Sequence, residues 1–212
     1  MRRLPVYLLL DTSGSMYGEP IAAVKNGVEM LLSTLRQDPY ALETAYISII
    51  TFDSTAQQIV PLTDLINFKV PDLIASGTTA LGSALTLVSS RIEKEVQKTT
   101  AETKGDWRPL VFVMTDGAPT DDWKKGVEKF KAARTGVVIA CAAGRAAQTD
   151  VLKNITEIVL QLDTADSNTI KSFFKWVSAS ISVGSQKVDL TKKDISDLDD
   201  LPPPPPEVNV VL

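Results

Sequence analysis

The side chains best suited to chemistry in this sequence are hydroxyls and carboxylates gathered in three short clusters. They are Asp-Thr-Ser-Gly-Ser at 11–15, Ser-Gly-Thr-Thr at 76–79 and Thr-Asp-Gly at 115–117. Hard oxygen donors suit Mg²⁺ first, with Mn²⁺ or Ca²⁺ as alternatives. Because only two donors are carboxylates, a bound ion would keep positive charge and accept a further carboxylate from a partner protein. The candidate ligands are Asp11, Ser13, Ser15, Thr79 and Asp116.

The sequence contains no histidine and one cysteine. The absence of histidine excludes Ser-His-Asp and Cys-His nucleophiles, histidine general bases and histidine-containing zinc sites. Cys141 has no partner for an internal disulfide, which is typical of a reducing compartment. Its apolar neighbours favour a small core residue over a reactive thiol.

The main alternative to a metal site that binds a partner protein is an enzyme, a metal-dependent phosphotransferase or hydrolase of the haloacid dehalogenase type. Such enzymes place an aspartate after the first strand and need a second carboxylate two residues later as the general acid, where this chain has Ser13. The chain also lacks the Gly-x-Gly-x-x-Gly, phosphate-loop and Gly-x-Ser-x-Gly motifs. We therefore expect a protein that is not an enzyme. Two alternatives remain open: a scaffold that a metal merely stabilises, and helix capping by the clustered residues.

Length, composition and charge limit the remaining classes. The chain has 212 residues, of which 44% are hydrophobic and 23% charged, as in an ordinary soluble domain with an extension. The net charge is −4, and the last 29 residues hold six acids against three lysines. No basic patch suggests nucleic acid or a membrane surface as a partner. No segment has the length of a membrane span, and a signal peptide fits the N-terminus poorly, so we expect a cytoplasmic protein.

Apolar runs of strand length alternate with segments of helical period, which predicts an α/β fold. The sheet should be doubly wound and mostly parallel, with helices on both faces. Residues 56–62 follow the second strand too closely for a crossover, so they should form one antiparallel edge strand, where Pro61 is tolerated. The expected strands are 4–10, 45–52, 110–114, 137–142 and 158–162, and the expected helices centre on 21–35, 81–96, 123–130 and 170–181.

Ligands of such sheets bind outside the carboxyl ends of the strands. The three polar clusters follow strands or precede helices at that edge, so they should meet there. Glu19 and Asp53 lie near the clusters and would either assist the ligands or remain solvated. Asp121 and Asp122 should favour the N-terminus of the helix that follows them.

The chain divides by composition into a domain, residues 1–183, and an acidic, proline-rich C-terminal tail, residues 184–212. Composition favours a disordered end. The alternative is a polyproline spacer at 202–206 that presents residues 207–212 for pairing with an exposed sheet edge. A further hypothesis is that the tail acids occupy the metal of a neighbouring molecule and inhibit it.

The ordered set Asp-x-Ser-x-Ser, a later threonine and a later Thr-Asp-Gly resembles the metal-ion-dependent adhesion site of von Willebrand factor A domains, over residues 6–181. The resemblance implies this doubly wound fold and a metal shell of Asp11, Ser13, Ser15, Thr79 and Asp116. Thr79 is preferred over Thr78 because the family's threonine usually precedes x-Leu-Gly, as at 79–82. It also implies a metal-dependent protein-protein interaction module.

Residues 115–123, Thr-Asp-Gly-Ala-Pro-Thr-Asp-Asp-Trp, are similar to the tellurium-resistance-associated, TerY-like subfamily. That likeness implies a bacterial role in tellurite resistance or stress signalling, with phosphatase-like or kinase-like proteins as partners. Nothing in the composition itself indicates tellurium chemistry.

Overall fold

A computed structural model describes residues 2–191 and 193–211 of the chain. Within them, seven strands form one sheet in the order β3-β2-β1-β4-β5-β6-β7. The five central strands, β2, β1, β4, β5 and β6, pair in parallel. The edge strands β3 and β7 run antiparallel to their neighbours. The strands are β1 (Leu4–Asp11), β2 (Ala45–Phe52), β3 (Ala56–Asp64), β4 (Leu110–Thr115), β5 (Val138–Ala143), β6 (Val159–Leu162) and β7 (Val208–Val211).

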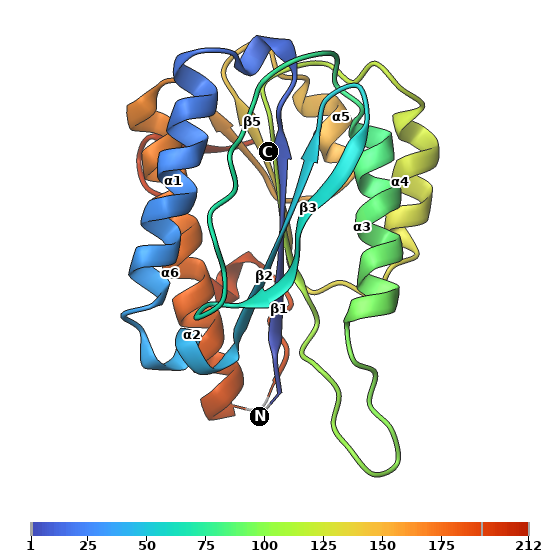
Figure 1. The fold of residues 1–212 in the computed structure, drawn as a ribbon, viewed down its shortest axis with the longest axis vertical. Coiled ribbons are helices and arrows are strands. Elements are labelled where there is room, and N and C mark those ends of the chain that lie inside the picture. Colours follow the sequence, from blue (N-terminus) through green and yellow to red (C-terminus); the bar gives the residue numbers. More distant parts are fainter. Residues whose placement is uncertain (1, 192, 212) are drawn as a thin grey trace.

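Helices cover both faces of the sheet (Figure 1). On one face α1 packs against α6, and on the other α3 packs against α4. Every residue of β1 and β4 is buried, as expected for central strands with helices on either side. The predicted fold class is confirmed. The helices are α1 (Glu19–Leu35), α2 (Pro39–Thr44), α3 (Leu81–Glu95), α4 (Trp123–Lys131), α5 (Thr149–Lys153) and α6 (Ser167–Thr191).

Two glycines let α3 and α4 cross closely. A Cβ atom on Gly126 would lie 2.4 Å from the carbonyl oxygen of Gly82, and one on Gly82 would lie 2.7 Å from that of Asp122. Any larger residue would push the helices apart.

The edge strand predicted after the second strand is present, because β3 pairs antiparallel with β2 across the turn at 53–55. The expectation of a single antiparallel edge strand is wrong. β7 pairs antiparallel with β6, from Val159 opposite Val211 to Leu162 opposite Val208. The last residues thus pair with a sheet edge of their own chain, whereas composition favoured a disordered end.

The tail is held to the domain by buried apolar side chains and a few polar contacts. Ile195, Leu201 and Val208 are buried, and each such side chain contributes about 1.5–3 kcal/mol when removed from water. Trp176 Nε1 donates to the Pro202 carbonyl at 2.8 Å. The predicted division at residue 184 falls inside α6, which continues to Thr191. The composition of the tail did not predict these contacts, because its apolar side chains occur singly among charged residues.

Within the described residues, no helix combines the length and the apolar character needed to cross a bilayer.

Cys141 lies in β5 and is fully buried, and burial raises the pKa of its thiol. The interpretation of Cys141 as a core residue is therefore confirmed.

Candidate metal centre

The carboxyl ends of β1 and β4 bring two of the polar clusters together. The strands are parallel neighbours, with Leu10 opposite Met114, so Asp11 at the end of β1 lies beside Thr115 at the end of β4. Thr115 Oγ1 donates to Asp11 Oδ2 at 2.5 Å, and both residues are buried. The sheet register thereby fixes Asp11 before any loop contributes.

The loop after β1 turns back over Asp11. The Ser13 N–H donates to Asp11 Oδ1 at 2.8 Å, and a 3₁₀ turn, Gly14–Met16, follows. The fully buried Met16 anchors this turn in the core. Ser13 therefore directly precedes this tight turn and Ser15 lies within it.

A second loop locks the first in place through backbone hydrogen bonds. The Gly14 N–H donates to the Gly77 carbonyl at 3.0 Å, and the Ser76 N–H donates to the Thr12 carbonyl at 2.9 Å. Gly77 has φ +72°, and a Cβ there would lie 2.4 Å from Ser54 Oγ. The position therefore requires glycine.

A chain of oxygens links the first cluster to the third. Ser13 Oγ lies 3.1 Å from Ser15 Oγ, and Ser15 Oγ donates to Asp116 Oδ1 at 2.7 Å. Asp11, Ser13 and Asp116 are buried, whereas Ser15 is exposed. The hydroxyl and carboxylate oxygens thus meet at the surface end of the sheet.

The structure places the side chains of Thr79 and Thr78 in different surroundings. A Cβ atom on Gly117 would lie 3.6 Å from Thr79 Oγ1 and 3.9 Å from Ser15 Oγ, so both hydroxyls face the same small space. Thr78 is exposed, and its hydroxyl donates to Ser54 Oγ at 3.3 Å. All five candidate ligands therefore belong to one neighbourhood, with Thr79 as the threonine that faces it.

Burial raises the pKa of Asp11, the neighbouring charge of Asp116 raises it further, and hydrogen bonds from Ser13 and Thr115 partly oppose this. A cation beside these two carboxylates would remove the repulsion and favour their ionised form. Two carboxylates with three hydroxyls are a hard, oxygen-only donor set, which fits Mg²⁺, Mn²⁺ or Ca²⁺. The residues present thus suit a divalent cation.

Sequence reasoning missed two threonines that support the site. Thr115 holds Asp11, and Thr120 accepts a hydrogen bond from the Thr79 N–H at 3.2 Å and donates its own N–H to the Thr79 carbonyl. The signal for Thr115 was a hydroxyl ending an apolar run. The signal for Thr120 was absent, since its partner is 41 residues away.

The acidic residues around the site serve helix termini and turns. Glu19 accepts from the Ser167 N–H at the start of α6, and Asp53 accepts from the Thr55 N–H in the β2–β3 turn. Asp122 accepts from Lys125 N in the first turn of α4, as predicted for the following helix. For Asp121 the prediction is wrong, because it accepts from the Gly82 and Ser83 N–H groups of α3.

This fold and its polar edge match one family. Residues 6–176 match the model of the von Willebrand factor type A domain, and the chain belongs to that family. Domains of this family are commonly metal-dependent protein-interaction modules. A comparison with curated proteins finds no match.

Solved structures agree on the fold. A von Willebrand factor type A protein from Catenulispora acidiphila superposes with a TM-score of 0.65 at 16% identity, over 85% of this chain and 43% of that one. The pilus adhesin SpaC from Lactobacillus rhamnosus GG gives 0.66 at 16% identity, over 86% and 31%. Proximal thread matrix protein 1 from the mussel byssus, with a zinc-occupied MIDAS motif, gives 0.61 at 18%, over 84% and 48%. This chain spans less than half the length of each.

Proposed function

We propose that this protein is a metal-dependent protein-binding module and not an enzyme. Asp11, Ser13, Ser15, Thr79 and Asp116 hold a divalent cation, some of them through water, and an aspartate or glutamate of a partner protein completes its coordination. The observation that carries the proposal is the meeting of two carboxylates and three hydroxyls at one end of the sheet. Mg²⁺ is the first candidate ion, with Mn²⁺ and Ca²⁺ next.

The donor set supports binding over catalysis. Ser13 stands where a haloacid-dehalogenase-type enzyme needs its acid, and the chain has no histidine to act as a general base. The two carboxylates, Asp11 and Asp116, are taken up by the cation in this proposal. Two carboxylates balance the charge of a divalent cation, but the three neutral hydroxyls leave it a hard Lewis acid that can accept a third carboxylate at an open coordination position.

The surroundings of the site suit a protein partner. Ser15 reaches the surface, and Tyr17, two residues further, is 80% exposed. Exposed tyrosines beside a charged anchor are typical of residues that contribute strongly to protein interfaces. We therefore expect Tyr17 to contact the partner next to the metal.

The narrower likeness at 115–123 keeps a bacterial tellurite-resistance or stress role, with phosphatase-like or kinase-like partners in the cytoplasm, as a prediction of the sequence. The matched family model covers von Willebrand factor A domains as a whole. The solved relatives include a pilus adhesin and a byssus protein. The zinc of the byssus protein makes Zn²⁺ a useful fourth ion to test here.

Calorimetry with Mg²⁺, Mn²⁺, Ca²⁺ and Zn²⁺ tests the ion site. The wild type should bind at least one of these ions, and Asp11→Ala should not. Asp72→Asn is the matched control, because Asp72 is an exposed carboxylate that pairs with Lys25 and is not among the candidate ligands. Equal affinities in wild type and Asp11→Ala would disprove the site.

An affinity capture with and without EDTA tests the partner. In the proposed function, association is lost with EDTA and with Asp11→Ala. If the metal only stabilised a scaffold, EDTA would lower the melting temperature and leave association unchanged. That second result would contradict a carboxylate-completed site.

A further inference from the structure

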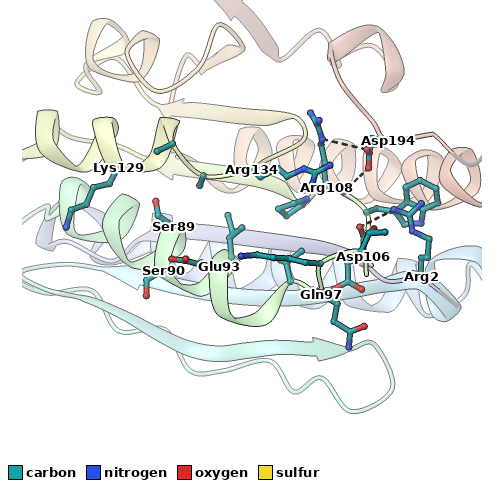
Figure 2. Close-up of a pocket in the computed structure, with 18 of the residues that line it drawn as sticks. Arg2, Ser89, Ser90, Glu93, Gln97, Asp106, Arg108, Lys129, Arg134 and Asp194 are labelled. Atoms are coloured by element: carbon teal, nitrogen blue, oxygen red, sulfur yellow. Dashed lines mark hydrogen bonds and ion pairs between the residues drawn. The ribbon is translucent and has the colours of Figure 1, made fainter. Parts of the chain in front are cut away.

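A pocket of about 570 Å³ lies at the opposite end of the sheet from the candidate metal centre. α3 and α4 both begin at the metal end and end at the opposite end of the sheet, where β4 begins after Arg108 and Pro109. The pocket opens between these elements, with Ser89, Ser90 and Glu93 on the α3 side and Lys129 on the α4 side (Figure 2). Its volume is that of a small-molecule site.

The lining carries more positive than negative charge, although the whole chain is negative. Two of its three acids are already matched by arginines. Asp106 binds Arg3 at 2.5 Å, and Asp194 accepts from the Arg108 N–H at 2.9 Å with its other oxygen 3.7 Å from Arg108 Nε. The five cationic residues of the lining are Arg2, Lys98, Arg108, Lys129 and Arg134.

Of these cations, Arg2 already has partners within the protein, whereas Lys129 and Arg134 are available to a ligand. Arg2 is occupied, since it stacks 3.3 Å above the Trp107 ring and donates to the Gly105 carbonyl. In the part of the chain that the structure describes, neither Lys129 nor Arg134 forms an ion pair, and both are exposed. Figure 2 shows Arg134 close to Arg108, across the opening from Glu93.

Apolar side chains supply the rest of the surface. Ile92 and Val96 of the α3 end line one side, and Pro109 with Ala132 and Ala133 lines the other. A purely inorganic anion would leave this surface against water. A ligand with an apolar body would cover it and gain about 25 cal/mol for each Å² buried.

We infer that this pocket binds a small organic anion with an apolar body. Arg134 and Arg108 bind its carboxylate or phosphate group, Lys129 at the other end of the opening adds positive charge, and the body lies against Ile92, Val96 and Pro109. The site does not depend on the metal centre, because no candidate metal ligand lines it.

The probe for this pocket is 8-anilinonaphthalene-1-sulfonate, a fluorescent organic anion, with the uncharged N-phenyl-1-naphthylamine as its matched analogue. The native protein in EDTA should bind the sulfonate and bind the neutral analogue at least about tenfold more weakly. Lys129→Ala/Arg134→Ala should weaken sulfonate binding roughly tenfold, about the contribution of one hydrogen bond to a charged group. Asp194→Asn frees Arg108 and should strengthen it.

The control is Lys175→Ala, an exposed lysine on α6 that does not line the pocket. Far-ultraviolet circular dichroism and melting temperature verify that each variant is folded. Benzoate and phenyl phosphate then compete with the probe: displacement by benzoate assigns carboxylates, and displacement by phenyl phosphate assigns phosphates. Equal binding of both dyes, an unchanged double variant, or displacement by neither competitor would overturn the inference.

Discussion

The two ends of the sheet differ in how their polar groups are positioned. At the carboxyl end, backbone hydrogen bonds between loops and side-chain bonds to strand ends hold buried oxygens. At the amino end, side chains from α3, from the end of α4 and from the segments after α4 and before β4 line an open pocket. Groups held by backbone geometry are fixed before a ligand arrives, whereas long cationic side chains adapt to one. The first end therefore suits an ion with strict geometry, and the second suits an organic anion with loose demands.

The largest expected effect separates the two ends completely. Asp11→Asn should lower Mg²⁺ affinity by roughly 100-fold or more, because the site loses one of its two charges. Binding of anilinonaphthalene sulfonate at the other end should not change. Titration calorimetry and dye fluorescence on the same preparation measure both.

For the same variant we also expect a defined direction of change in the stability of the fold. Burial raises the pKa of Asp11. A raised carboxyl pKa means that the folded state disfavours the charge, so this residue's stabilising contribution exists at low pH and is lost as pH rises. In EDTA at neutral pH, Asp11→Asn should melt at the wild-type temperature or above it. A marked drop would show that the carboxylate is structural without metal.

Gly77→Ala tests whether backbone geometry holds the metal end. An alanine at φ +72° with its Cβ 2.4 Å from Ser54 Oγ should cost about 1–3 kcal/mol of unfolding free energy. Mg²⁺ affinity should fall with it, because Gly77 bonds the loop that carries Ser13 and Ser15. Urea denaturation gives the first quantity. Unchanged stability would mean that the loop shifts without strain.

Asp200→Asn tests the ion pair that holds the tail near the C-terminal end of α6. A hydrogen bond from the Lys187 side chain and one from the Ser196 N–H lower the pKa of Asp200. A lowered pKa stabilises the fold above the unfolded pKa, and this gain is lost as pH falls. Because the pair is near the surface, we expect a loss of about 0.5–1 kcal/mol at neutral pH.

That loss should shrink toward zero as the solution is acidified through the range where Asp200 protonates. Denaturation at several pH values, with wild type alongside, measures the trend. Lys25 and Asp72 form the comparison pair on the surface of the domain. An Asp200→Asn penalty that stayed constant with pH would point to a lost hydrogen bond and not to charge.

Gly117→Ala should give the smallest effect. The added methyl would lie at ordinary contact distances of 3.6 Å from Thr79 Oγ1 and 3.9 Å from Ser15 Oγ. Stability should stay within about 0.5 kcal/mol, the usual range for a surface substitution, while Mg²⁺ affinity falls a few-fold by crowding. Calorimetry beside a thermal melt separates the two. A change in stability without a change in affinity would place Thr79 outside the site.

Much of the carboxyl end could be predicted from the sequence, because it depends on local order. An apolar run that ends in Asp-Thr-Ser-Gly-Ser indicates both a buried strand and the loop that follows it. The choice of Thr79 over Thr78 came from a family pattern, and the structure turns Thr79 toward Ser15 and Thr78 toward Ser54. Metal ligation itself stays a prediction.

The sequence by itself determined the alternating strands and helices, the hairpin at the sheet edge and the order of the five candidate ligands, because periodicity and short motifs are local signals. Only the tertiary structure decided that Asp121 serves α3, that the tail adds β7 to the sheet, and that a cationic pocket lies at the amino end. Each of these depends on contacts between residues tens of positions apart. Such contacts follow from how the packed helices and strands place their ends, and no local pattern encodes them.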